Sequence, residues 1–137
     1  MTGPFLIKRS FHFYAAHRND DLPTHRCYSI HGHTYFVDVY IESHQLEDHS
    51  YSVLFSDIER RVSTVLEAFE HSMIINRHDP IFPVLESTGS KLCVLEVTPS
   101  AENVARIIFD RIKATTELNI VQLDLRETTT SVVTYRG

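Results

Sequence analysis

Two stretches of alternating apolar residues, separated by a long polar loop, constrain the fold of this chain more than any other feature. Between Phe5 and His17 apolar or small side chains recur at about every second position, and a second alternating stretch runs from His31 to Glu42. The polar segment between them, residues 18–30, is far longer than a tight hairpin needs. Loops of that size within compact domains are usually functional or disordered. We therefore expect two paired strands that carry a loop with a role of its own.

The remainder of the chain predicts two helices and three shorter strands. Apolar residues recur at spacings of three and four between Ile58 and Phe69 and again between Val104 and Ile112. The candidate N-caps are Ser56 or Asp57 for the first helix and Thr98 or Ser100 for the second. The expected strands are 92–97, 120–128 and 132–136, and residues 76–90 are expected to be irregular.

The element order β-β-α-β-α-β-β favours an α+β fold, with two helices on one face of a four-stranded antiparallel sheet. No repeat, low-complexity segment or linker divides the chain, so residues 1–137 are expected to form a single domain. An open sheet has two edge strands, which proteins either protect or pair with another subunit. The pattern therefore predicts a homo-oligomer.

Composition excludes several classes of protein. The 137 residues are 42% hydrophobic and 23% charged, which is typical of a globular chain and not of a disordered one. No apolar run exceeds four residues, so neither a membrane span nor a secretory signal is expected. A net charge of −5 favours neither nucleic acid nor an anionic membrane as a partner. Two cysteines, Cys27 and Cys93, are too few for a disulfide framework and indicate a cytoplasmic protein with reduced thiols.

Histidine is the residue type that points to chemistry, with nine in the chain. His31 and His33 lie two apart on a predicted strand and therefore share a face, and His17 ends the preceding strand. If the two strands pair, three neutral imidazoles meet, as in a catalytic zinc site whose fourth position is open. A fortuitous, exposed His-x-His is the competing interpretation. Five other histidines are expected to be solvated surface residues: His12, His25, His44, His49 and His78.

Cys27, inside the loop, has two competing roles. It could be a fourth zinc ligand that closes the site and makes it structural, or a thiolate near the ion that acts as a general base. A small buried hydrophobe is the third interpretation, and it is the one that we give to Cys93.

Six segments together carry a resemblance to a known family. They are Phe13-Tyr14-Ala15-Ala16-His17-Arg18, Cys27-x-x-x-His31-Gly32-His33, Phe55-Ser56-Asp57-Ile58, Glu70-His71, Pro99-Ser100-Ala101-Glu102-Asn103-Val104-Ala105 and Arg126-Glu127-Thr128. They cover nearly the whole chain and as a set resemble the 6-pyruvoyltetrahydropterin synthase/6-carboxytetrahydropterin synthase family. The spacing from Cys27 to His31 is similar to that of the bacterial carboxytetrahydropterin branch, which makes a precursor of 7-deazaguanine (queuosine).

The resemblance implies a tunnelling fold, in which subunits join their sheets into a barrel and two rings stack as a homohexamer. It also implies 7,8-dihydroneopterin triphosphate as the substrate and Zn²⁺ as the cofactor. By the same resemblance, His17, His31 and His33 hold the zinc, which polarises the side-chain oxygens of the substrate.

Further roles follow from the resemblance. Cys27 would remove a proton from the substrate, and His71 would relay or return it with help from Glu70. Glu102 is implied to bind the substrate. A substrate-binding role for Glu127 also has a chemical basis independent of the resemblance, because one carboxylate can accept hydrogen bonds from both the 2-amino group and N3–H of a pterin.

Three departures from the family pattern concern the relay more than the zinc ligands. Glu70 stands where the family has Asp, Leu54 stands where it commonly has Asp, and the segment 71–76 is one residue longer than usual. Since no glycine-rich phosphate loop is present, Arg18 and Arg26 are candidates to meet the triphosphate, or else ordinary surface residues.

Three alternatives to the carboxytetrahydropterin activity remain. The first is the pyruvoyl activity, which only eliminates triphosphate and tautomerises its product. The second is a non-catalytic protein with a closed site of Cys27 and the three histidines. The third, a cupin-type oxidase, is disfavoured because the glutamate of that motif is missing after His33.

Overall fold

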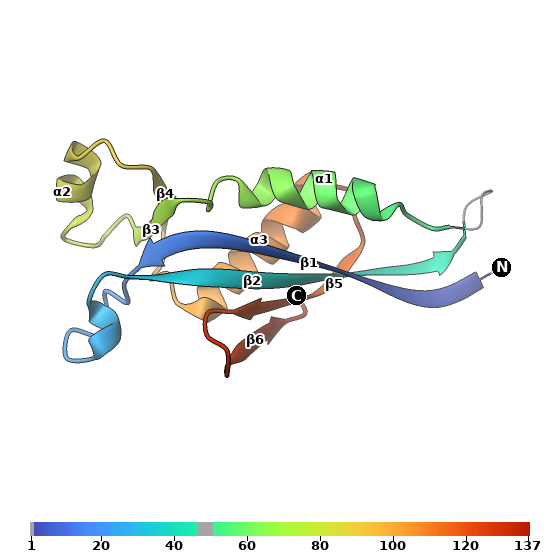
Figure 1. Ribbon diagram of the computed structural model, residues 1–137, viewed down its shortest axis with the longest axis horizontal. Coiled ribbons are helices and arrows are strands. Elements are labelled where there is room, and N and C mark those ends of the chain that lie inside the picture. Colours follow the sequence, from blue (N-terminus) through green and yellow to red (C-terminus); the bar gives the residue numbers. More distant parts are fainter. Residues whose placement is uncertain (1, 47–50) are drawn as a thin grey trace.

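The computed structural model describes residues 2–46 and 51–137, so His49 lies outside the described residues. The strands are β1 (Thr2–His17), β2 (His31–Gln45), β3 (Ser72–Asn76), β4 (Leu92–Leu95), β5 (Ile120–Arg126) and β6 (Val132–Tyr135). The helices are α1 (Phe55–Leu66), α2 (Phe82–Ser87) and α3 (Ala101–Thr115), with a 3₁₀ turn, η1, at Arg26–Tyr28. Figure 1 shows α1 and α3 against the sheet, and α2 beyond the C-terminal end of β1.

The strands form one sheet in the order β4-β3-β1-β2-β5-β6. The α+β class is confirmed, but the prediction of four antiparallel strands is wrong, because the sheet has six strands and is mixed. β3 pairs in parallel with both β1 and β4. β3 was not predicted because all five of its residues are buried, which removes the alternation that identifies a half-exposed strand.

The core fills the space between one face of the sheet and the two longer helices. Alternate residues of β1 and β2, such as Phe13 and Tyr35, are buried there, while Tyr14 and Phe36 between them are exposed on the other face. Ile58 of α1 and other apolar residues of both helices complete the same cluster. Burying each such side chain contributes roughly 1.5–3 kcal/mol, so this face fixes which side of β1 and β2 points inward.

The helix boundaries confirm one predicted cap and correct another. The Ser100 side chain accepts a hydrogen bond from the backbone N–H of Asn103 and caps α3, as one of the two alternatives predicted. The N-cap of α1 is Leu54, not Ser56 or Asp57, and no side-chain bond caps that helix. Helix α2 lies within the segment expected to be irregular, since six residues with a proline are too short to show a helical period.

The register of β1 against β2 sets up the functional end of the molecule. The two strands pair antiparallel, with His17 opposite His31 and Ala15 opposite His33. Residues directly opposite on one face of an antiparallel pair lie about 4.5–5.5 Å apart at Cβ. The three histidines therefore gather where the long loop leaves β1 and enters β2.

Histidines His12, His25, His44 and His78 are exposed, and Cys93 is buried, as predicted.

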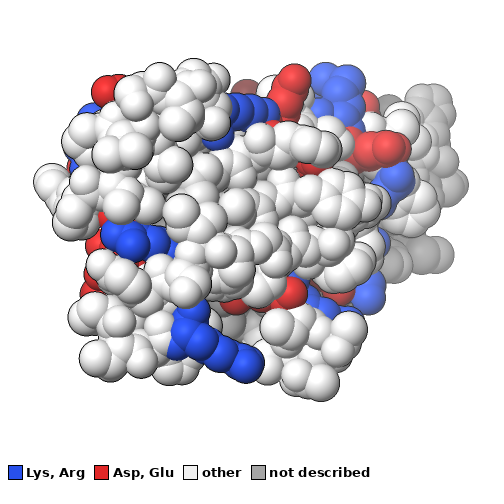
Figure 2. All heavy atoms as spheres, turned by 60° about the vertical axis from the view of Figure 1, so that its left-hand side comes forward, with Lys and Arg blue, Asp and Glu red and all other residues white. Residues whose placement is uncertain are grey.

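Among the described residues, no helix has the length and apolar character needed to cross a bilayer. Figure 2 shows the end of the molecule that bears the loop, where Lys and Arg side chains are scattered among acidic and uncharged ones.

Candidate metal centre and its pocket

The three predicted histidines form one cluster. Candidate ligand atoms of His17, His31 and His33 all lie within 4.8 Å of one another, and the Nε2 atoms of His17 and His33 are 3.1 Å apart. Cys27 does not belong to this group. The geometry thus supports a three-histidine site, and it disfavours the closed site of one cysteine and three histidines.

The second nitrogen of two of these rings is fixed by the backbone. Nδ1 of His17 lies 2.7 Å from the Pro99 carbonyl oxygen, and Nδ1 of His31 lies 2.6 Å from that of Ser29. Because a carbonyl oxygen only accepts, Nδ1–H must be the donor in each pair. Each neutral ring then presents the lone pair of Nε2 to the cluster, which is the tautomer that a metal ligand requires.

Burial favours the neutral form of two of these imidazoles, His17 and His33. Desolvation, together with the neighbouring His31 and His33, lowers the pKa of His17 from 6.5 to about 4. Burial and His31 lower the pKa of His33 as well. Metal ions bind neutral imidazole, so protons compete little at these positions near neutral pH.

The carboxylate of Glu127 lies beside the histidine cluster. Its two carboxylate oxygens lie 3.9 Å from Nε2 of His17 and 3.7 Å from Nε2 of His33, and its Oε1 is buried with no hydrogen-bond partner. Burial, and then the nearby charge of Glu102, raise the pKa of Glu127. A buried acceptor without a donor marks a place for a ligand or a cation. The three nitrogens and this carboxylate fit a divalent metal with a polar ligand beside it.

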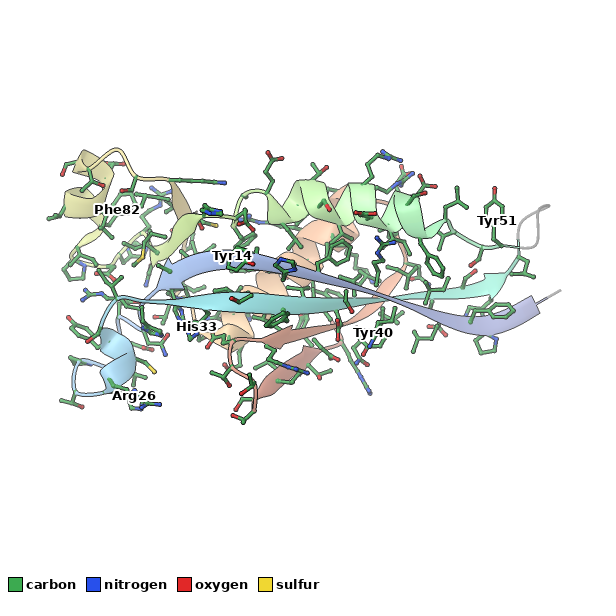
Figure 3. The ribbon with its side chains drawn as sticks, viewed as in Figure 1. Tyr14, Arg26, His33, Tyr40, Tyr51 and Phe82 are labelled. Carbon is green, nitrogen blue, oxygen red and sulfur yellow. The ribbon has the colours of Figure 1, made fainter. Side chains whose placement is uncertain are left out.

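A pocket of about 360 Å³ opens over the cluster. Its lining residues are His17, Asn19, Arg26, Cys27, His31, His33, Glu127 and Thr128. This volume is within the range of small-molecule sites. Figure 3 shows the loop with Arg26 beyond the strand end that carries His33. The sequence prediction did not include Asn19 and Thr128, although each directly follows or nearly follows a predicted site residue.

The predicted relay pair lies elsewhere on the chain. Nδ1 of His71 is 2.6 Å from a carboxylate oxygen of Glu70, and Glu70 also accepts from the backbone N–H of Tyr14 at 3.3 Å. The His71 side chain is 79% exposed beside the Tyr14 ring, and neither Glu70 nor His71 lines the pocket. Tyr14 and His17 point to opposite faces of β1. One chain therefore does not bring this pair to its own metal centre.

Two other candidates also differ from expectation. Arg18 does not reach the pocket as a free charge, because it is buried in an ion pair with Asp79. No sequence signal identified Asp79 as its partner. Glu102 is exposed in the first turn of α3, close enough to influence Glu127 but not lining the pocket. Arg26 does line the pocket.

Together the fold and the site define a class of protein: a small α+β chain with three histidines that could hold a metal ion, in the lining of a pocket of small-molecule size. A family model described as 6-pyruvoyl tetrahydropterin synthase matches residues 6–137. The chain belongs to that family and is an enzyme of the tetrahydropterin synthase type.

Curated relatives and solved structures agree with this assignment. The chain is 31% identical over 140 residues to the 6-carboxy-5,6,7,8-tetrahydropterin synthase of Haemophilus influenzae, covering 96% of this chain and 99% of the relative. It is 26% identical over 156 residues to the enzyme of that name from Aquifex aeolicus, covering 95% and 96%. The 6-pyruvoyl tetrahydropterin synthase structure from Caenorhabditis elegans superposes with a TM-score of 0.76 at 20% identity, covering 98% and 96%. The fold is thus that of the tetrahydropterin synthases.

Proposed function

We propose that the chain is a zinc-dependent lyase of the cytoplasm that converts 7,8-dihydroneopterin triphosphate to 6-carboxy-5,6,7,8-tetrahydropterin. The observation that carries the proposal is the cluster of His17, His31 and His33 in one pocket with Glu127, whose buried Oε1 has no hydrogen-bond partner. The curated relatives named above, which are called carboxytetrahydropterin synthases, support the carboxy product over the pyruvoyl one.

In this mechanism His17, His31 and His33 would hold the zinc ion. When bound, zinc supplies Lewis-acid polarisation of the oxygens on the substrate side chain. Glu127 accepts hydrogen bonds from N3–H and the 2-amino group of the pterin, which orients the side chain toward the histidines. Each such charge-assisted bond contributes about 1.5–3 kcal/mol.

Cys27 is the proposed general base. It lies on the pocket wall, outside the histidine cluster, so its thiol is free to act on the substrate and not only on the ion. Arg26, also on the pocket wall, is the cation available to the triphosphate. Glu102 is the second proposed substrate-binding carboxylate, and its charge is near Glu127.

His71 and Glu70 return the proton from a neighbouring protomer. Their position outside the pocket of their own chain supports this arrangement, since the pair can act only where another pocket comes to meet it. We therefore propose a homohexamer, a dimer of trimers, in which pockets are shared between subunits.

A product assay on the zinc-loaded protein tests the proposed reaction. The carboxy route releases acetaldehyde together with triphosphate, whereas the pyruvoyl route releases triphosphate alone. Acetaldehyde formation that disappears in Cys27→Ala, with bound zinc unchanged, is the expected result. Release of triphosphate without acetaldehyde would assign the pyruvoyl activity instead, and release of neither product would overturn both.

A further inference from the structure

The loop that carries Cys27 and Arg26 is fastened at its base by a buried ion pair. Nε and Nη2 of Arg18, the first residue of the loop, donate to the two carboxylate oxygens of Asp79 at 2.8 and 2.5 Å. The side chains are only 9% and 1% exposed. Two parallel bonds between a guanidinium and a carboxylate fix direction as well as distance. The start of the loop is thus oriented by a residue 61 positions further along the chain.

Asp79 is itself held in place. Its Oδ1 accepts from the backbone N–H of Ile81 at 2.9 Å, and its own N–H donates to the Asn76 carbonyl at 3.0 Å. The Asn76 side chain makes a second bridge, donating to Asp20 at 3.2 Å. The turn between β3 and α2 is therefore a fixed anchor for the loop. Figure 1 shows the loop and the α2 segment at the same end of the sheet.

The other side of Arg18 contacts the part of the loop that bears the thiol. The guanidinium carbon lies 4.3 Å from the centre of the Tyr28 ring, and Tyr28 directly follows Cys27. The backbone N–H of Asn19 donates to the Cys27 carbonyl at 2.8 Å, which closes the loop at the same level. Arg18 thus connects Asp79 on one side to the neighbour of Cys27 on the other.

The other hydrogen bonds within the loop are those of short local turns, such as Leu22 N–H to the Asn19 carbonyl and Tyr28 N–H to the His25 carbonyl. Residues 21–26 are exposed, and the turn η1 contains no buried residue. Burying an ion pair costs desolvation that an apolar pair would not incur, so such pairs are weak contributors to stability and better explained by the geometry that they impose. The geometry imposed here is that of the segment that brings Cys27 and Arg26 to the pocket wall.

We propose that Arg18, Tyr28 and Asp79 form a clamp that positions the thiol of Cys27 at the metal pocket, and that all three are positioning residues for the reaction. The inference rests on the proposed function only where it takes Cys27 as the group that moves the proton. The placement of Cys27 by the clamp can be measured without any substrate.

The test compares Tyr28→Leu and Asp79→Asn with Tyr28→Phe in the zinc-loaded protein. Tyr28→Leu removes the ring but leaves the ion pair intact, so it strands no buried charge, and Tyr28→Phe retains the ring. Arg77→Gln is the matched control, because Arg77 makes an ion pair of similar length with Glu96 on the same turn but both side chains are exposed. The readouts are the rate of Cys27 alkylation by iodoacetamide, resolved from Cys93 by peptide mass spectrometry, the zinc content and kcat.

The expected result is a several-fold change in Cys27 alkylation in Tyr28→Leu and Asp79→Asn with zinc content unchanged, and in Tyr28→Leu, which keeps the ion pair, with Cys93 alkylation unchanged as well. kcat should fall by up to about 10²-fold, which is the effect of a misplacement of about 1 Å. Tyr28→Phe and Arg77→Gln should behave as the parent protein. Equal acceleration at Cys27 and buried Cys93 in Tyr28→Leu would show global loosening and overturn the clamp, as would unchanged Cys27 alkylation in both disruptive variants.

If the parent protein forms no pterin product, the proposed function fails, while the alkylation comparison still decides the clamp. If the parent protein is active and the alkylation rates do not differ, the clamp fails and the proposed function stands.

Discussion

At the scale of single residues, the site depends on which nitrogen each imidazole presents. The carbonyl groups of Pro99 and Ser29 each accept from an Nδ1–H, so the tautomers of His17 and His31 are set by backbone that belongs to the start of α3 and to the loop. Second partners of this kind usually affect metal affinity by 10–100-fold when they are lost. The ligands are thus ready for a cation before it arrives.

Replacing one ligand should abolish metal binding. His17→Ala removes one of three nitrogens, and we expect the zinc content of purified protein to fall from near one ion per chain to near zero. The measurement is elemental analysis after dialysis against a weak chelator. His44→Ala is the control, since His44 is exposed and pairs only with Glu42 among the contacts described. Retention of a full complement of zinc in His17→Ala would contradict the assignment.

Glu127→Gln should separate substrate binding from metal binding. The amide replaces an acceptor by a group that opposes the pterin donors, so we expect KM to rise by about one to two orders of magnitude. Zinc content should stay unchanged. Steady-state kinetics and elemental analysis check the two halves, and Glu96→Gln, at an exposed carboxylate, is the control. Loss of zinc with an unaltered KM would instead make Glu127 a metal ligand.

The histidine cluster could be predicted because the sequence pattern that indicates it is local. His31 and His33 share a face by the two-residue period, and His17 joins them as soon as the two strands pair. The environment of Arg18 could not be predicted, because its partner Asp79 lies in a different segment and neither residue stands in a pattern that points to the other. The same holds for the distance of His71 from the pocket.

At the scale of elements, α3 couples the fold to the metal centre. Ser100 caps this helix, and the residue before it, Pro99, supplies the carbonyl that orients His17. The cap thereby fixes where that carbonyl stands. Helix α1 has no such cap, since Leu54 occupies its N-cap position.

These two helix ends give opposite predictions. Ser100→Ala should lower the free energy of unfolding by about 0.5–2 kcal/mol, because the N–H of Asn103 loses its acceptor. Leu54→Asp should raise it by up to a similar amount, because an acceptor is added where none exists. Urea denaturation of both variants measures the changes. An unchanged Ser100→Ala protein would show that the cap bond contributes nothing.

The anchor of the loop predicts a pH dependence of stability. Burial alone would raise the pKa of Asp79, but bonds from Arg18 and the Ile81 N–H outweigh it, so the pKa lies below 3.8. Near that pH the folded chain binds fewer protons than the unfolded one, so this stabilisation is present above about pH 4 and decreases as pH falls through the folded-state pKa.

Asp79→Asn, which cannot ionise, should therefore be less stable than the parent protein by about 3–5 kcal/mol at neutral pH. The difference should shrink in acid, as the parent loses the same interaction. Urea denaturation at pH 7 and near pH 3 gives the two differences. A gap that is independent of pH would mean that the Asp79 charge does not contribute.

The elements themselves were predictable to different degrees. The long strands β1 and β2 and the helices α1 and α3 have clear periods, and each is close to its predicted range. β3 and its parallel pairing beside β1 were not predicted, because a uniformly buried strand of five residues shows no alternation and its neighbours come from distant parts of the chain. Sequence pattern specifies what an element is more readily than where it docks.

At the scale of the whole molecule, the sheet ends in two short strands, β4 and β6, and no strand of the described residues pairs with the outer edge of either. The Glu70–His71 pair is exposed on the outer side of β1. Both features leave the isolated chain incomplete for the proposed reaction, which is why we propose the assembly.

Subunit mixing tests that assembly. Cys27→Ala and His71→Ala should each be inactive alone, but co-refolded hexamers should recover part of the activity, since some pockets then combine an intact Cys27 with an intact His71 from a neighbour. Turnover of the mixture against the separate variants is the measurement. Absence of recovery in a mixture that sizing shows to be assembled would contradict a pocket that combines Cys27 and His71 of two subunits.

The position of His17 and His31 at the last residue pair between β1 and β2 has one more consequence. A cation held there would link the two ends of the loop reversibly, because residues 18–30 leave the sheet after His17 and rejoin it at His31. That restraint on the ends of the loop would be imposed once, at metal uptake, in addition to the β1–β2 pairing and the Arg18–Asp79 ion pair, and not again each time that a pterin enters. Metal loading would thereby also serve as the step that matures the loop for repeated turnover.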